Sequence, residues 1–308
     1  MSELPGLLWG TILLRPYVFA FLAVYIMAGC GHIGWRTTLT FIPAGYSLAW
    51  LSEFSSIHWG FPYGDYFYIQ STANRELWVF GVPLMDSLSY VFLSYCSYSL
   101  AVFMMSPVSF RSGHPVTPQT SRIRFSRRTL ILGAFLFMLL DMVIDPVALQ
   151  GERWFLGRIY GYRHEGFYFG VPMSNFGGWL FVGVVLILTL QALERVFAQD
   201  SRREPAANRS SWIGLLGPAL YFSVLLFNIA VTFYIGETLL GLVDLTLFAA
   251  LLALIYFFIF NKSSRVPDDE AHAQPSPPSS VSGNSALDPD LTRHLAQHRG
   301  WDPQESGD

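Results

Sequence analysis

Long runs of apolar residues separated by short polar stretches dominate the first 260 positions. Seven of these runs are long enough to cross a bilayer as helices, which takes about 20 residues each. They cover approximately residues 17–34, 38–56, 82–105, 129–149, 172–193, 213–235 and 238–260. The pattern therefore predicts an all-α polytopic membrane protein with about seven transmembrane helices.

The segments outside these runs divide the chain into three parts. Residues 1–16 form a short amphipathic N-terminal segment, and residues 17–260 form the transmembrane domain. Residues 261–308 are rich in Pro, Ser, Asp and Gln, so we expect a disordered C-terminal tail. The composition agrees, because charged residues are only 13 % of the chain and the mean hydropathy is +0.38.

The basic residues gather in alternate loops. One set of loops holds Arg36, five arginines within 107–128, four within 195–209, and Lys262 with Arg265. The positive-inside rule places these loops and the C-terminal tail on the cytoplasmic side of the cell membrane. Two loops rich in aromatic residues and glycine, 58–80 and 150–170, are then expected on the outer side.

An internal repeat relates two parts of the chain. The segment FGVPLMD at 80–86 matches FGVPMSN at 169–175, and each copy closes an aromatic loop and opens an apolar run. The repeat units cover about 38–105 and 129–193, and both run in the same direction. A parallel repeat predicts two halves related by a pseudo-twofold axis along the membrane normal, with a cleft between them.

Four carboxylic acids lie in or at the ends of the apolar runs of the two repeat units. Asp141 and Asp145 are spaced i, i+4 on one helix face, Glu53 lies near the end of an earlier run, and Asp86 lies in the first turn of another. Pro146 predicts a kink or helix end directly after this pair. An acid inside a membrane costs at least about 2.5–3.5 kcal/mol at mid-depth and is therefore expected to face a polar interior.

Two interpretations of the acids stay open. In one, a water-restricted pocket lets one carboxylic acid donate a proton while an ionised partner accepts one from water. In the other, the acids are structural and bind arginines or backbone donors near the interface. Asp244, in the last run, could join the other acids or bond locally.

Aromatic residues make up 16 % of the chain and are dense in the two outer loops. An interfacial belt of Trp and Tyr explains part of this enrichment. A π-rich surface for an unsaturated hydrophobic ligand is the other explanation, since aromatic faces stabilise cations. The candidate ligand-binding residues are Tyr63, Tyr66, Trp78, Trp154, Tyr160, Tyr168, Asn175 and Trp179.

Several classes of site are not indicated by the sequence. No phosphate-binding, dinucleotide-binding, CxxC or GxSxG motif is present, and His58 and His164 lack the spacing of metal ligands. We therefore predict no metal and no cofactor. The arginine-rich loops are cytoplasmic flanks of membrane helices and do not indicate nucleic-acid binding.

The motifs together resemble those of a known family. Glu53, GFPYGDYFY at 60–68, FGVPLMD, QGERWF after Asp145–Pro146, and YFGVPMSNFGGWLFVG at 168–183 are similar to the integral-membrane carotenoid hydratases of the CruF type. The resemblance covers residues 17–260 and implies acid-catalysed addition of water to the terminal 1,2 double bond of an acyclic carotenoid, giving a tertiary alcohol. The implied partners are an acyclic carotenoid, water, the lipid bilayer and other carotenoid-pathway enzymes.

The resemblance assigns no catalytic residue, so the roles come from the pattern of acids. We expect Asp141 or Asp145 to protonate the alkene, and Glu53, Asp86 or Asn175 to position the water or accept its proton. One rival is a membrane prenyl or carotenoid-end transferase, for which Asp141 and Asp145 form a single DxxxD motif. A carotenoid or lipid carrier built on the repeat is a second rival.

Overall fold

The computed structural model describes residues 3–107, 109–111, 114–116, 119–199 and 213–263. The expected disordered tail, from 264 onward, and the arginines at 202, 203 and 209 lie outside the described residues.

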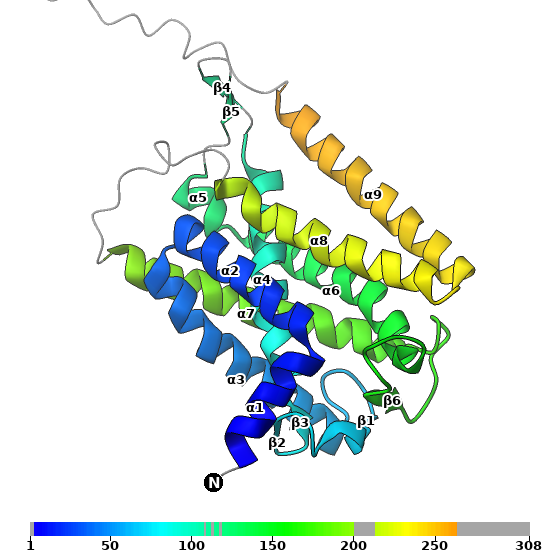
Figure 1. Ribbon diagram of the computed structural model, residues 1–308. Coiled ribbons are helices and arrows are strands. Elements are labelled where there is room, and N and C mark those ends of the chain that lie inside the picture. The colour runs from blue at the N-terminus through cyan, green and yellow to red at the C-terminus, as the bar shows by residue number, and fades with distance from the viewer. Residues whose placement is uncertain (1–2, 108, 112–113, 117–118, 200–212, 264–308) are drawn as a thin grey trace, which may run out of the picture. The chain divides into compact units, whose positions relative to one another are not determined.

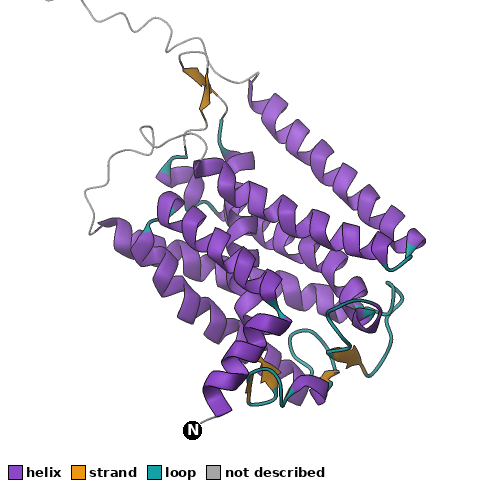
Figure 2. Cartoon of the chain, in the orientation of Figure 1, coloured by secondary structure: helices purple, strands orange, loops and turns teal. Residues whose placement is uncertain are grey.

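The elements are shown in Figures 1 and 2. The α-helices are α1 (Glu3–Leu14), α2 (Pro16–His32), α3 (Trp35–Trp59), α4 (Leu84–Met105), α5 (Ser121–Arg124), α6 (Arg127–Leu149), α7 (Met173–Gln199), α8 (Ile213–Tyr234) and α9 (Thr238–Ser263). The strands and short 3-10 helices are β1 (Tyr66–Tyr68), η1 (Gln70–Thr72), β2 (Trp78–Val79), β3 (Val82–Pro83), β4 (Ser109–Arg111), β5 (His114–Val116), η2 (Gly151–Arg153) and β6 (Tyr160–Tyr162).

Each apolar run expected to cross the membrane forms a helix. Among the described residues, five helices are long and apolar enough to span a bilayer: α4, α6, α7, α8 and α9. Helices α1 and α2 pass the same test together, as a pair bent by 87°. Helix α3 does not pass it. The helices indicate a multi-pass membrane protein, while the expected number of seven crossings stays a prediction.

Local sequence signals set several helix ends. Pro16 begins α2, where the missing N–H of a proline has no intrahelical partner to lose. Gly60 ends α3 in the left-handed conformation (φ 70°), and its N–H bonds the carbonyl of Ser56. Ser126 caps α6 by accepting a hydrogen bond from the N–H of Thr129.

Helix α6 continues through Pro146 to Leu149, so of the two expectations for the proline, a kink or a helix end, the helix end is excluded. A proline inside a helix leaves the carbonyl four residues earlier without its usual N–H donor. The hydroxyl of Tyr168 donates to this carbonyl, at Met142, over 3.2 Å. The second aromatic loop therefore supplies the bond that the proline removes.

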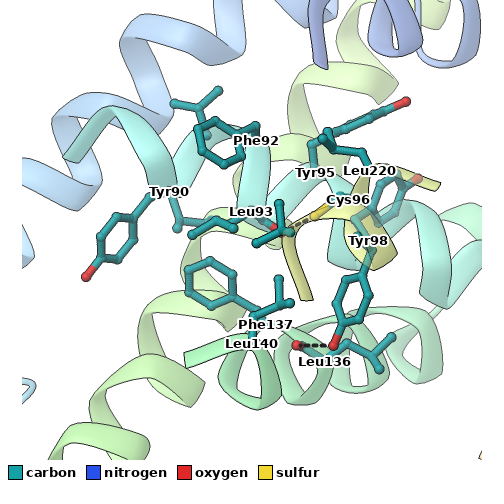
Figure 3. Close-up of a cluster of buried hydrophobic side chains, with 14 of the residues drawn as sticks. Tyr90, Phe92, Leu93, Tyr95, Cys96, Tyr98, Leu136, Phe137, Leu140 and Leu220 are labelled. Atoms are coloured by element: carbon teal, nitrogen blue, oxygen red, sulfur yellow. Dashed lines mark hydrogen bonds between the residues drawn. The ribbon is translucent and has the colours of Figure 1, made fainter. Parts of the chain in front are cut away.

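Helix α4 forms the centre of the hydrophobic core. Every residue from Tyr90 to Val102 is buried, as expected for a helix with neighbours on all sides. Figure 3 shows its Phe92, Leu93 and Tyr95 packed with residues of α6 and α8. Helix α9 packs against α8 at the edge of this core (Figure 1), to which it contributes Leu251. The central position of α4 brings its first turns, with Asp86 and Tyr90, among the other helices.

The two aromatic loops are joined by a short antiparallel ribbon. Strand β1 pairs with β6, with Tyr66 opposite Tyr162 and Tyr68 opposite Tyr160. Residues two apart in a strand share a face, as do directly opposed residues. The four tyrosines of this ribbon (Tyr66, Tyr68, Tyr160 and Tyr162, the ribbon tyrosines) therefore lie on one face.

The two copies of the repeated motif share their backbone geometry. Phe80 and Phe169 both have φ 49°, and the glycines that follow, at 81 and 170, have φ 84° and 87°. Val79 pairs with Val82 in the β2–β3 hairpin, and Tyr168 pairs with Val171 in the second copy. Positive φ angles are rare for residues other than glycine, so their recurrence at Phe80 and Phe169 indicates that the two copies of the motif adopt the same turn.

Candidate active site

A cavity of about 130 Å³ lies between the helices and the ribbon. All four predicted acids line it: Glu53 from α3, Asp86 from α4, and Asp141 and Asp145 from α6. Asn175, from the start of α7, lines it too. Both segments predicted as repeat units, 38–105 and 129–193, thus contribute acids to one cavity, although the part of these acids in catalysis stays a prediction.

Glu53 is surrounded by phenol hydroxyls. Tyr66 and Tyr68 donate to its Oε2, the latter over 2.8 Å, and Tyr90 donates to its Oε1. Tyr68 also contacts Oδ2 of Asp86. A hydroxyl has only one proton, so Tyr68 cannot donate to both acids at once. A proton on either Glu53 or Asp86 would satisfy the second contact.

Asp145 is likewise surrounded by phenol hydroxyls. Tyr160 donates to its Oδ1 and Tyr162 to its Oδ2, the latter over 2.6 Å. The Nδ2 of Asn175 donates to Asp141 over 2.6 Å and to Asp145 over 3.2 Å. Glu53 and Asp145 are thus each held by the two tyrosines of the strand from their own repeat unit.

The residues one helical turn before Glu53 and Asp145 differ. Asp141 precedes Asp145 by four residues, whereas Ala49 stands at that place before Glu53. Within the described residues, Asp141 accepts a single side-chain hydrogen bond, from Asn175. Because hydrogen bonds donated to a carboxylate favour its ionised form, Asp141 is the less stabilised anion of the α6 pair.

Three of the ribbon tyrosines, Tyr68, Tyr160 and Tyr162, stay protonated at neutral pH. Burial, with the adjacent Asp86 and Glu53, raises the pKa of Tyr68 well above the ordinary value of 10. Burial and the neighbouring Asp145 do the same to the pKa of Tyr160 and of Tyr162. These side chains therefore remain hydrogen-bond donors to the acids.

Aromatic rings form the wall beside the acids. Tyr90 stacks on Trp179 with ring centroids 4.6 Å apart, and Tyr63 lies 6.1 Å from Trp179. Tyr90 and Trp179 occupy matching positions, seven residues after the prolines of the two repeated motifs. Their contact places corresponding residues of the halves face to face.

Gly178 allows this wall to form. A Cβ at this position would lie 2.6 Å from both the carbonyl oxygen of Pro62 and Cδ1 of Tyr63. Real Cβ atoms do not approach other atoms so closely, and a backbone oxygen has little freedom to move. The glycine in the GGW sequence thus permits close approach of α7 to the first aromatic loop.

We expect Gly178→Ala to destabilise the protein by about 1–3 kcal/mol, because the added methyl overpacks this contact. Gly177→Ala is the matched control, since a Cβ there meets nothing within 4 Å. The control should keep or slightly raise stability, as alanine favours helices. Thermal unfolding of both variants in one detergent measures the difference, and equal midpoints would contradict this role of Gly178.

Some predicted residues lie elsewhere. Trp78 and Tyr168 are not among the cavity-lining residues; the ring of Trp78 lies against Tyr68, and Tyr168 bonds the Met142 carbonyl. Asp244 bonds locally, accepting from Thr232 over 3.2 Å, and does not line the cavity. The other predicted ligand-binding residues, Tyr63, Tyr66, Trp154, Tyr160, Asn175 and Trp179, do line it.

Three tyrosines that contact the acids were not predicted as site residues: Tyr68, Tyr90 and Tyr162. The Tyr-x-Tyr spacing at 66–68 and 160–162 contains a usable signal, because alternate residues of a strand share a face. Tyr90 could have been found from its position one turn after Asp86 on α4.

The described residues contain no group of three or more His, Cys, Asp or Glu side chains arranged to hold a metal ion. Two arginines of the second aromatic loop are paired outside the cavity. Arg153 bonds Glu237, and Arg163 bonds Asp65 over 3.1 Å.

Comparison with known proteins identifies the family. The curated proteins and the solved structures contain no match to this chain. The family model described as "Carotenoid biosynthesis protein" matches residues 12–257, a range that includes every residue lining the cavity. The chain therefore belongs to the carotenoid biosynthesis protein family and has a role in carotenoid biosynthesis.

Proposed function

We propose that the protein adds water to the terminal double bond of an acyclic carotenoid, giving a tertiary alcohol. The observation that carries this proposal is the convergence of four acids and an aromatic wall on one cavity. Hydration of an alkene needs a proton donor, shielding of a cation, and an acceptor for a proton of water. The family's role in carotenoid biosynthesis supports the substrate class.

Asp141 is the proton donor in this proposal. It is buried and, within the described residues, accepts only the hydrogen bond from Asn175. The π electrons of the double bond take the proton of Asp141 and form a new C–H bond at one alkene carbon. The positive charge then lies on the tertiary carbon, in a cavity lined by the aromatic side chains of Tyr63, Tyr90 and Trp179.

Asp145 or Glu53 accepts the proton of the attacking water. The water oxygen forms a bond to the cationic carbon and loses one proton, so the sum of the steps is addition of one water. Both acceptors are held by ribbon tyrosines that favour the ionised carboxylate. If Asp145 takes the proton, the hydrogen bonds from Asn175 to both carboxylates keep Asp145 beside Asp141. The proton can then pass from Asp145 to Asp141, which becomes the donor for the next turnover.

The size of the cavity suits an end group and water. An engineered apolar cavity of roughly 150 Å³ holds benzene, and this one measures about 130 Å³. A branched end group is of that size, but a complete carotenoid is far longer. The cavity would therefore take one chain end at a time.

The remaining architectural assignments belong to the same proposal. Residues 17–260 form the catalytic domain, with seven crossings and a parallel repeat of units 38–105 and 129–193. The matching φ angles of Phe80 and Phe169 and the equivalent settings of Glu53 and Asp145 support the repeat. The arginine distribution supports insertion in the cell membrane with the ribbon outside and the tail in the cytoplasm.

The transferase alternative is less well supported by the same geometry. A diphosphate requires cationic partners, and Arg153 and Arg163 are engaged with Glu237 and Asp65. The cavity acids are bonded mainly to tyrosines and to Asn175.

Co-expression with a pathway that makes an acyclic carotenoid tests the proposal. Mass spectrometry of the extracted pigments should show a product heavier by one water, which cells with an empty vector lack. Pigment of unchanged mass that co-purifies with the protein would support a carrier and contradict hydration. A mass gain equal to a prenyl group would support the transferase.

A further inference from the structure

Part of the cavity wall is lined by aromatic and aliphatic residues from α2, α8 and the second aromatic loop. These residues are Tyr17 and Phe21 of α2, Val224 and Phe227 of α8, and Trp154 of the second aromatic loop. Asn228 of α8 is a polar residue that also lines the cavity, and its side-chain amide donates to the carbonyl of Val224. The aromatic members contact one another: Tyr17 stacks on Phe227 with centroids 5.6 Å apart, and Phe21 lies 6.0 Å from Phe227.

An exposed aromatic ring packs directly against two of these residues. Phe155 is 59 % exposed, so it lies on the surface of the protein. Its ring is 4.9 Å from that of Trp154 and 5.5 Å from that of Tyr17. Both of these residues line the cavity. A continuous set of rings therefore connects the cavity interior with the outside.

Its position along α8 places the ring of Phe227 within the membrane. Phe227 lies seven residues before the end of α8 at Tyr234, or about 10 Å at 1.5 Å per residue. An opening at this depth faces acyl chains rather than water. The chemistry of the lining, aromatic and aliphatic, suits a conjugated hydrocarbon chain.

We propose that the polyene of the substrate leaves the cavity between α2 and α8, past Tyr17, Trp154 and Phe227 (the aromatic portal), into the lipid. This inference rests on the proposed function, because the acids must hold one end of the molecule. A cavity of about 130 Å³ leaves most of a carotenoid outside, so the chain needs a route out. In this proposal the portal residues hold the polyene in position and do not contact the reacting carbons.

Photocrosslinking on the complete purified protein tests the portal independently of catalysis. Phe155 is replaced by a photoreactive benzoyl-phenylalanine, and the same replacement at Phe257 of α9 is the control. The two side chains are 59 % and 58 % exposed, and Phe257 does not line the cavity. With lycopene as the probe, crosslinking should be severalfold stronger at 155 than at 257. Equal crosslinking at both positions, stronger crosslinking at 257, or none at 155 would overturn the portal.

A kinetic test separates the portal from the chemistry. Phe227→Trp, which enlarges a portal ring, should raise KM for lycopene about tenfold and affect kcat less. Leu226→Trp, at a half-exposed position next to it on the same helix, is the control and should leave KM unchanged. An unchanged KM in Phe227→Trp, or an equal rise in both variants, would overturn the portal. Crosslinking at 155 in a protein that forms no hydrated product would instead overturn hydration and keep the portal.

Discussion

Asp141→Asn should lower the rate of carotenoid hydration by about 10²–10⁴-fold, the range for loss of a general acid. The amide has nearly the shape of the carboxyl group, and its oxygen can still accept the hydrogen bond that Asn175 donates over 2.6 Å. It cannot donate a proton to an alkene. The loss should therefore appear in kcat, and the carotenoid should still bind.

The matched control for this variant is Asp244→Asn. Asp244 is also a buried acid in an apolar helix, but it bonds Thr232 and does not line the cavity. Its variant should keep hydration within a few-fold of the wild type. Assays in membranes with equal amounts of each protein measure both. Near-normal activity of Asp141→Asn would remove Asp141 from the role of proton donor.

Arg15→Met should destabilise the protein by about 3–5 kcal/mol, as expected when one partner of a buried ion pair is removed. Arg15 stands at the bend between α1 and α2 and is 1 % exposed, and its partner Glu76 is 0 % exposed. Their two hydrogen bonds measure 3.1 and 3.2 Å. Without Arg15, the carboxylate of Glu76 keeps only the bond from Thr72 within the described residues.

The double variant Arg15→Met/Glu76→Gln separates the unpaired charge from other effects of the substitution. Because the uncompensated carboxylate causes most of the loss, the double variant should recover most of the stability. Thermal unfolding in one detergent compares the wild type, both single variants and the double variant. If Arg15→Met were as stable as the wild type, or the double variant less stable than Arg15→Met, this explanation would be incorrect.

The sequence predicted the helices well because each apolar run is long and bounded by clear signals. The run at 129–149, for example, corresponds closely to α6, Arg127–Leu149. The acids could be selected from the cost of burying charge alone, and all four line the cavity. The repeated FGVP motif identified the two segments that share the φ of 49° at Phe80 and Phe169.

The other features of the fold and of the site depend on contacts between segments that are far apart in the sequence. Hydrophobic patterns do not specify such contacts. The pairing of Tyr66 with Tyr162 spans nearly a hundred positions and is made in loops of mixed composition. Where α6 continues past Pro146, the freed Met142 carbonyl accepts a hydrogen bond from Tyr168, 26 residues further along the chain. Arg15 lies at the end of the predicted N-terminal segment 1–16, where the pattern gives no sign of burial, but it stands at the bend of 87° and is buried with Glu76.

Incubation of the purified protein with lycopene in water labelled with heavy oxygen tests the central claim most directly. If the acids of the cavity hydrate the terminal alkene, mass spectrometry will show a tertiary alcohol that carries the heavy oxygen, and Asp141→Asn will not form it. Unchanged lycopene with the wild-type protein, or an alcohol without the label, would contradict the account.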